Sequence, residues 1–185
     1  MTLLDDAIVF AIHAHSGQLR KGTNTPYILH PLEAAAIVAS MTDDLEIIAA
    51  AVLHDTLEDA HTSMYEIADK FGERVAGLVN SETENKREDL PASDTWLIRK
   101  QKTIQHLDGE KDLAVKMVAL GDKLSNIRSM YRDHLALGDQ LWERFNQKDP
   151  KKHAWYYRAI ADATVELEKF PAWQEYTALV EKVFS

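Results

Sequence analysis

The sequence predicts an all-α protein, with residues 1–185 folding as a single helical-bundle domain. Apolar residues recur every three or four positions along most of the chain, which is the spacing of helices with one buried face. No stretch shows the alternation of apolar and polar residues that is typical of a half-buried strand. A length of 185 residues, with 45% of them hydrophobic, suits one core rather than two domains.

Each expected helix follows from local signals. The segment 43–59 opens with Asp43 and Asp44, which the helix dipole favours at a helix start, and continues with apolar residues at helical spacing. Ser63 and Glu66 have the spacing of a capping box, and Gly72 suits the end of that short helix. We expect helices at about residues 3–15, 31–41, 43–59, 63–70, 73–84, 94–107, 110–131, 152–168 and 171–183.

Three stretches are expected to be loops. Residues 17–27 contain two glycines and a proline, residues 85–91 are polar and end in a proline, and residues 138–150 are of mixed composition. None resembles a long linker, so the sequence favours one compact domain.

Composition excludes several kinds of protein. The chain has no cysteine, which fits the reducing cytoplasm and leaves His, Asp and Glu as the metal ligands. A formal net charge of −9 disfavours binding to nucleic acid polymers but allows a small anionic ligand in a local basic pocket. The N-terminus lacks the pattern of a signal peptide, and no apolar run is long enough to cross a membrane. We therefore expect a cytoplasmic protein.

The richest polar cluster closes the segment 43–59. On a continuous helix, Glu58 would lie one turn beyond His54 and Asp55, and Asp59 one turn beyond Asp55. One interpretation is a solvated acidic helix end. However, three carboxylates at the negative end of a helix dipole are unfavourable without a cation. The cluster therefore favours a metal held by His54 and Asp55, with a nearby carboxylate that accepts a proton from water.

Two further segments carry candidate ligands. His30 precedes Pro31, which suits a helix start and biases His30 away from helical dihedrals, although such a histidine is often only a cap or a packed side chain. Asp122 and Asn126 share one helix face. Gly121 costs about 1 kcal/mol relative to alanine in a helix, which a close approach by another helix or a ligand would explain. An exposed Asp beside an incidental Gly is the alternative.

Two imidazoles and two carboxylates could together form a metal site, from His30, His54, Asp55 and Asp122. This mixture of ligands suits Mn²⁺ or Fe²⁺ with room for water. Zinc is an alternative, although four protein ligands would tend to close its tetrahedral site.

These motifs together resemble a known family, the HD-domain metal phosphohydrolases. Within it the chain is most similar to the small alarmone hydrolases and to the hydrolase domain of bifunctional alarmone synthetase/hydrolases. The resemblance covers about residues 5–130 and is carried, in order, by HSGQLRKG (15–22), YILHP (27–31), HDTLED (54–59), FG (71–72) and DKLSNIR (122–128).

The resemblance implies an HD-type all-α fold, a Mn²⁺ ion (with Fe²⁺, Co²⁺ or Zn²⁺ as alternatives) and hydrolysis of the 3′-pyrophosphate of (p)ppGpp-type guanosine or adenosine alarmones. It assigns the metal to His30, His54, Asp55 and Asp122, and the attacking water to Glu58 and Asp59. It assigns the nucleotide to Arg20, Lys21, Asn126, Ser129 and Tyr156. The alternative for the segment around Tyr156 is a structural role, with Trp155, Tyr157 and Ile160 in the core and the lysines on a solvated face. Residues 80–90 match no motif.

Two other functions share some of these features. An HD-type phosphohydrolase acting on another nucleotide phosphoester would need the same four ligands but not Arg20 and Lys21. A non-catalytic nucleotide-binding module would not need Glu58 and Asp59. In each case the expected partner is a small nucleotide rather than a nucleic acid polymer or a membrane.

Overall fold

The computed structural model describes residues 2–60, 62–84 and 92–185, and within these ranges the protein is helical. The extended structure there is an isolated antiparallel bridge between Leu19 and Pro26. This confirms the prediction of an all-α fold. In the same ranges, no helix combines the length and the apolar character needed to cross a membrane.

The helices follow one another closely along the chain. Their bounds are α1 Leu3–Ala14, α2 Leu29–Ala39, α3 Leu45–Leu53, α4 Thr56–Asp59, α5 Met64–Phe71, α6 Glu73–Glu82, α7 Ala92–Gly109, α8 Leu113–Leu137, α9 Pro150–Ala163 and α10 Pro171–Phe184, with short 3-10 helices η1 Gly138–Arg144 and η2 Val165–Leu167.

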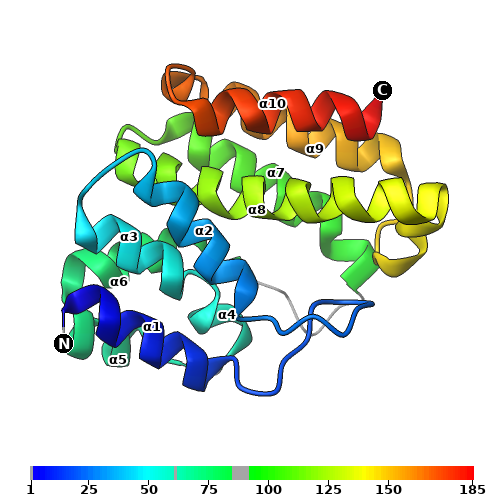
Figure 1. Cartoon of the computed structure of the whole chain (residues 1–185). Helices are drawn as coiled ribbons and strands as arrows, with labels where there is room; N and C mark the ends of the chain where they lie inside the picture. The colour runs from blue at the N-terminus through cyan, green and yellow to red at the C-terminus, as the bar shows by residue number, and fades with distance from the viewer. Residues whose placement is uncertain (1, 61, 85–91) are drawn as a thin grey trace.

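The long helix α8 is the centre of the fold (Figure 1). On one side α8 packs against α2 and α3, and α3 in turn contacts α1 and α6. On the other side α8 packs against α10, which contacts α9. Helix α7 also packs against α9. The core helix α3 fits this arrangement because all of residues 47–53 are buried. Elements from both halves of the chain thus meet along α8.

The predicted local signals are present at helix ends. The Ser63 side chain accepts a hydrogen bond from the backbone N–H of Glu66 at 3.1 Å, at the start of α5. Gly72, with φ of 91°, ends α5 in a conformation that favours glycine. A further cap, not among those predicted, lies at the start of α8, where the Asp112 side chain accepts from the N–H of Ala114 at 2.8 Å.

Gly121 lies where α8 packs tightly against α2. A Cβ atom at this position would lie 2.7 Å from Val38 Cγ2 and 2.9 Å from the backbone oxygen of Ala34. The explanation of this glycine by a neighbouring helix is therefore confirmed. The close contact sets the separation of two helices that each carry a predicted metal ligand.

Several predicted boundaries were wrong. The segment 43–59 is divided by a turn at residues 54–55, so α3 and α4 are separate. Helix α2 begins at Leu29, which places His30 inside the first helical turn rather than before the helix. Pro31 is still tolerated there, because the first N–H groups of a helix have no partner within it.

The C-terminal half differs from the prediction in a similar way. Helix α8 runs six residues past the expected end at 131, to Leu137, where Gly138 with φ of 55° ends it. The expected loop at 138–150 contains η1, because Leu141 and Trp142 are buried against the core. The segment 152–168 is divided into α9 and η2. The loop predicted at 85–91 lies outside the described residues.

Candidate metal centre and active site

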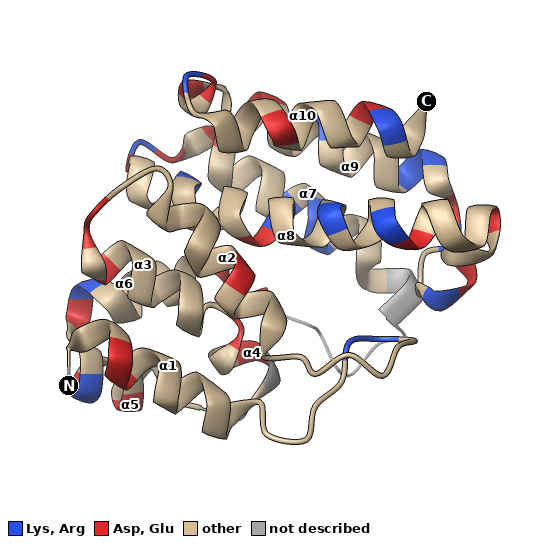
Figure 2. Cartoon of the chain, in the orientation of Figure 1, with Lys and Arg blue, Asp and Glu red and all other residues tan. Residues whose placement is uncertain are grey.

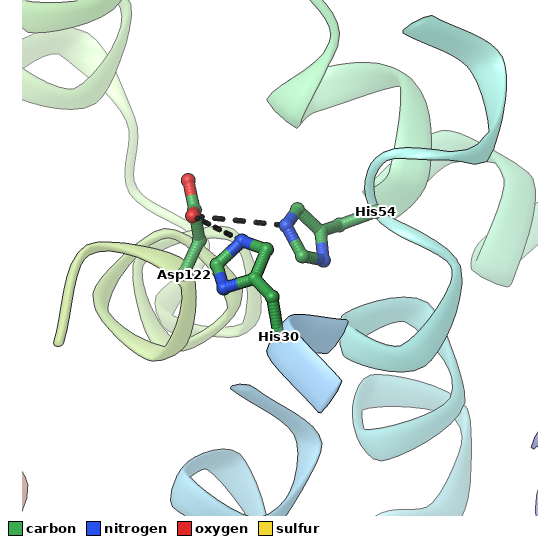
Figure 3. A group of neighbouring side chains, drawn as sticks. All are labelled: His30, His54 and Asp122. Carbon is green, nitrogen blue, oxygen red and sulfur yellow. Dashed lines mark ion pairs between the residues drawn. The ribbon is translucent and has the colours of Figure 1, made fainter. Parts of the chain in front are cut away.

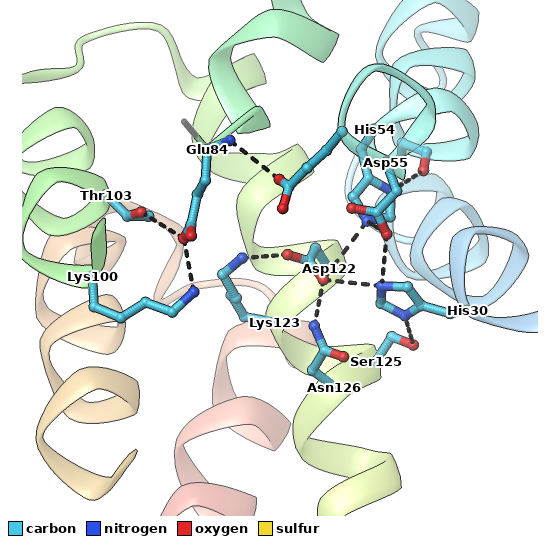
Figure 4. Close-up of polar contacts among 12 residues, drawn as sticks. His30, His54, Asp55, Glu84, Lys100, Thr103, Asp122, Lys123, Ser125 and Asn126 are labelled. Atoms are coloured by element: carbon cyan, nitrogen blue, oxygen red, sulfur yellow. Dashed lines mark hydrogen bonds and ion pairs between the residues drawn. The ribbon is translucent and has the colours of Figure 1, made fainter. Parts of the chain in front are cut away.

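Three separate parts of the fold bring the four predicted ligands together. Helix α2 supplies His30, the turn between α3 and α4 supplies His54 and Asp55, and α8 supplies Asp122. Figure 3 shows His30, His54 and Asp122, and Figure 4 adds Asp55. The turn explains how two consecutive residues can serve one site, because adjacent side chains on a continuous helix do not face the same direction. The break in the expected helix is therefore part of the site.

The ligand atoms of these side chains lie close together, with Asp55 next to the two histidines. The Nε2 atom of His30 lies 3.1 Å from Asp122 Oδ1, and the Nε2 atom of His54 lies 3.0 Å from Asp55 Oδ2. The remaining nitrogen–oxygen distances are 3.5 Å from His30 to Asp55 and 3.7 Å from His54 to Asp122. His30, His54 and Asp122 each offer a ligand atom within 4.8 Å of the others. Such convergence suits a single cation.

The histidine geometry also fits a metal. The Nδ1 atom of His54 lies 2.8 Å from the backbone oxygen of Ala51, and a carbonyl can only accept, so Nδ1 carries the hydrogen. In the neutral ring Nε2 then presents its lone pair to the centre. This buried Nε2 atom has no hydrogen-bond partner within the described residues. An imidazole lone pair facing carboxylates is satisfied by a cation.

The surroundings of Asp55 and Asp122 keep both carboxylates ionised, the state that binds a cation. His30, His54 and Asp122 are only 4%, 2% and 7% exposed. Burial would raise the pKa of Asp122, but the Lys123 ammonium, together with the two histidines in their protonated, cation-free form, holds it well below its usual range. Burial would likewise raise the pKa of Asp55, but His54 lowers it when the imidazole is protonated, the form that the two carboxylates favour when no cation is bound. Both acids are ionised at neutral pH.

Further polar contacts orient the two carboxylates, and Figure 4 shows those of Asp122. The Tyr27 hydroxyl donates to Asp55 Oδ2 at 2.6 Å, and the Asn126 amide donates to Asp122 Oδ1 at 2.5 Å. Lys123 pairs with the other oxygen of Asp122. Lys123 therefore offsets part of the negative charge of Asp122.

The candidate catalytic acids lie on α4. Glu58 Oε2 accepts a hydrogen bond from the backbone N–H of Glu84 at 3.2 Å. Because α4 follows the turn, Glu58 does not lie on the same helix as His54, so the continuous helix assumed between them was wrong. The last residue of α4 is Asp59, whose side chain lies outside the described part of the structure.

Sequence reasoning missed a group of charged residues next to these acids. Glu84 pairs with Arg99 at 2.9 Å and Lys100 at 2.7 Å, and accepts from Thr103 at 3.0 Å. Figure 4 shows the contacts with Lys100 and Thr103. Burial raises the pKa of Glu82 to about 7. Both acids border a cavity of about 300 Å³. The segment 80–84 matched no motif, so only the folded arrangement of α6 and α7 identifies these residues.

Positive charge lies close to this centre. Figure 2 shows Lys and Arg residues along α7 and α8, beside the acidic residues of α2 and α4. The cavity next to Glu82 and Glu84 also borders Arg99, Lys102 and Lys123. Such a distribution can bind a ligand that carries several negative charges, although the chain as a whole is acidic.

Four of the predicted nucleotide contacts border a second cavity, of about 190 Å³: Arg20, Lys21, Asn126 and Ser129. Arg20 Nη2 donates to Asn126 Oδ1 at 2.8 Å, and the Arg20 guanidinium lies 5.7 Å from the centre of the Tyr27 ring. Lys21 donates to Asn146 at 3.0 Å. These contacts connect the cavity to the metal centre, since Asn126 also bonds Asp122.

The fifth predicted contact, Tyr156, does not border this cavity. Tyr156 is 3% exposed, lies against Trp96 and Tyr157, and is covered by Lys100, whose ammonium is 4.8 Å from the ring centre. Its hydroxyl has no hydrogen-bond partner within the described residues. The neighbouring Tyr157 borders the cavity instead.

Comparison with known proteins identifies the class. Residues 7–143 match the model of the HD domain family. This range contains His30, His54, Asp55 and Asp122. The match covers more than half of the chain, and this protein therefore belongs to the HD domain family.

Its relatives are named for alarmone metabolism. The guanosine-3′,5′-bis(diphosphate) 3′-pyrophosphohydrolase of Aquifex aeolicus is 39% identical over 125 residues, which are 68% of this chain but only 17% of that protein. The guanosine-3′,5′-bis(diphosphate) 3′-pyrophosphohydrolase MESH1 of Danio rerio is 36% identical over 133 residues, 70% of each chain. This chain thus corresponds to one part of the longer relatives and to most of the small one.

Two solved structures share the fold. A metazoan ortholog of SpoT, described as hydrolysing ppGpp, superposes with a TM-score of 0.77 over 98% of this chain and 96% of its own, at 21% identity. A protein of Listeria monocytogenes EGD-e superposes with a TM-score of 0.73 over 84% of this chain and 98% of its own, at 31% identity. These likenesses confirm the HD-type helical fold predicted from the sequence.

Proposed function

We propose that this protein is a metal-dependent hydrolase that removes the 3′-pyrophosphate from guanosine or adenosine 3′-pyrophosphate alarmones of the (p)ppGpp type. The observation that carries the proposal is the convergence of two imidazoles and two carboxylates next to the cavity bordered by Arg20 and Lys21. The Danio rerio relative, which this chain matches over most of its length, supports the choice of substrate.

The metal ligands in this proposal are His30, His54, Asp55 and Asp122, and the ion is Mn²⁺. A mixed imidazole and carboxylate set suits Mn²⁺, with Fe²⁺, Co²⁺ or Zn²⁺ as alternatives. When bound, such an ion supplies charge neutralisation for the phosphates and lowers the pKa of water. The ionised state of Asp55 and Asp122 favours binding of any of these cations.

The chain itself supplies the proton transfer and the charge balance. Glu58 is the proposed general base for the attacking water, held in place by the Glu84 N–H, and Asp59 is its proposed partner. Lys123, next to the centre and paired with Asp122, can stabilise negative charge that develops on the phosphate.

The nucleotide occupies the cavity of Arg20, Lys21, Asn126 and Ser129 in this proposal. A guanidinium plane such as that of Arg20 stacks well on a purine base. Asn126 forms hydrogen bonds with both Arg20 and Asp122, so it can hold the nucleotide-binding side chain at a fixed distance from the metal ligand. Tyr156 remains a proposed contact on the Lys100 side, through its unpaired hydroxyl.

The direct test is product analysis. The Mn²⁺-loaded protein is incubated with guanosine and, separately, adenosine 3′-pyrophosphates, and released pyrophosphate is measured. Release from either nucleotide supports the proposal, and the ratio of the two rates gives the base preference. A preference for nucleotide monoesters would instead indicate an HD-type phosphohydrolase that acts on another nucleotide phosphoester. Tight nucleotide binding without turnover, across several metals, would indicate a non-catalytic nucleotide-binding module.

Two variants test the assigned roles. Glu58→Gln should bind metal normally and lose turnover by about 10²–10⁴-fold, the usual contribution of a general base. Asp122→Ala should lose the metal, as measured by metal content after dialysis. Glu181→Gln, on the exposed surface, is the matched control and should behave as wild type. Wild-type turnover by Glu58→Gln would remove Glu58 from this role.

A further inference from the structure

A chain of polar side chains leads away from the metal centre behind His30. The Nδ1 atom of His30 lies 2.8 Å from Ser125 Oγ, and Ser125 Oγ lies 2.8 Å from Glu33 Oε2 (Figure 4 shows the first of these contacts). Ser125 is 1% exposed, so this hydroxyl exchanges little with bulk water. His30 and Glu33 belong to α2 and Ser125 to α8. The contacts therefore bridge the two helices at the metal centre.

The direction of each hydrogen bond in the series His30–Ser125–Glu33 follows from the partner of Glu33. The guanidinium of Arg128 lies 3.3 Å from Glu33 Oε1 and also bonds Glu175 at 2.6 Å. A carboxylate paired with arginine accepts hydrogen bonds, so Ser125 donates its single hydrogen to Glu33. The Ser125 oxygen can then only accept from His30, which places the hydrogen of the neutral ring on Nδ1. The Nε2 lone pair consequently points into the metal centre.

The two histidines thus reach the same tautomer by different means. His54 is fixed by a backbone oxygen, that of Ala51, which no substitution removes. His30 depends on two side chains, Ser125 and Glu33. From this difference we propose that Glu33 and Ser125 are positioning residues that hold His30 in its metal-binding tautomer. The inference rests on the proposed metal site but does not depend on which substrate the protein hydrolyses.

The alternative tautomer would oppose metal binding. His30 Nε2 lies 3.1 Å from Asp122 Oδ1, close enough to donate a hydrogen bond if Nε2 carried the hydrogen. Such a bond would occupy one ligand atom of each residue at once. The hydrogen-bond chain through Ser125 prevents this, because it keeps the hydrogen on the opposite ring nitrogen.

The test measures metal binding rather than turnover. Zn²⁺ is used as a diamagnetic probe, and its affinity is measured by competition with a chelator. Ser125→Ala should bind Zn²⁺ about 10–100-fold more weakly than wild type, the usual effect of losing the partner of a ligating histidine. Glu33→Gln keeps the shape but not the charge, and should lie between Ser125→Ala and wild type. Ser40→Ala, at the far end of α2, is the matched control and should retain wild-type affinity.

A spectroscopic readout separates positioning from packing. In the Zn²⁺-loaded protein, Ser125→Ala should shift or broaden the Nδ1–H resonance of His30 and leave that of His54 unchanged, because Ala51 still accepts from His54. Wild-type Zn²⁺ affinity in Ser125→Ala would overturn the proposal. So would weakened affinity with an unchanged His30 resonance. Neither outcome bears on the proposed hydrolysis, which is tested separately with the nucleotides.

Discussion

Replacing Gly121 with alanine would test how the contact between α2 and α8 supports the metal centre. Alanine favours a helix by about 1 kcal/mol over glycine, so local propensity alone predicts a more stable protein. The structure predicts the opposite. The new methyl group would lie 2.9 Å from the backbone oxygen of Ala34 and 2.7 Å from Val38 Cγ2. The backbone oxygen cannot move away by a change of side-chain rotamer, so α2 itself must shift.

The size of the effect follows from these opposing contributions. Overpacking a core contact costs about 1–3 kcal/mol, and the helical gain offsets about 1 kcal/mol. We expect a net loss of up to about 2 kcal/mol in the free energy of unfolding, which for a protein of this size lowers Tm by up to about 8 °C. The shift should also move His30, on α2, away from Asp122, the neighbour of Gly121. The increase in Tm on adding Mn²⁺ should therefore be smaller than in wild type.

The assay is thermal and urea unfolding with and without Mn²⁺. Gly77→Ala provides the matched control, because Gly77 lies inside α6 and a Cβ there meets no described atom within 4 Å. That variant should gain about 0.5–1 kcal/mol. If Gly121→Ala were stabilised like Gly77→Ala, or retained the full Mn²⁺ effect, the contact would not hold the two helices in place.

Two further predictions concern the regions on either side of the metal centre. Burial opposes the ionisation of Glu84, but Lys100 and Arg99 outweigh it, so the pKa of Glu84 lies below its ordinary value of 4.5. A lowered carboxyl pKa contributes stability that is present above the unfolded-state value and is lost as the pH falls through the folded-state value. Urea unfolding should thus show Glu84→Gln less stable than wild type at pH 7, with the difference shrinking below about pH 4.5; a difference independent of pH would contradict this. In steady-state kinetics Arg20→Ala should raise KM about 2- to 30-fold, the range expected from the loss of one stacked guanidinium, with kcat little changed. The exposed control Arg158→Ala should leave KM unchanged. An Arg20→Ala variant that loses only kcat would assign Arg20 another role.

Local sequence signals predicted most helices because they act within a few residues. The Ser63 cap and the end of α5 at Gly72 are examples. The turn at His54 and Asp55 was missed because it contains neither glycine nor proline, and the apolar spacing runs into it without a break. Its cause is tertiary: the turn directs two consecutive side chains toward residues on α2 and α8.

The site also combines residues that local sequence motifs identify with residues that only the tertiary structure brings in. The four candidate ligands lie in motifs, and the structure brings them together as expected. Glu82 and Glu84 have no comparable signal, because their position depends on how the end of α6 meets α7. Tyr156 is implied as a nucleotide contact by the family resemblance alone, and no local signal indicated that it would lie under Lys100 while the neighbouring Tyr157 borders the cavity.

The candidate ligands come from α2, the α3–α4 turn and α8, which are far apart along the chain. A metal ion held there would act as a reversible cross-link that closes two long loops of polypeptide. Since the unfolded chain lacks the assembled site, ion binding would add to the stability of the native state, by about 2.7 kcal/mol at a free concentration of 100 times Kd. Metal supply would then govern how long the protein survives in its folded form, independently of any reaction that it catalyses.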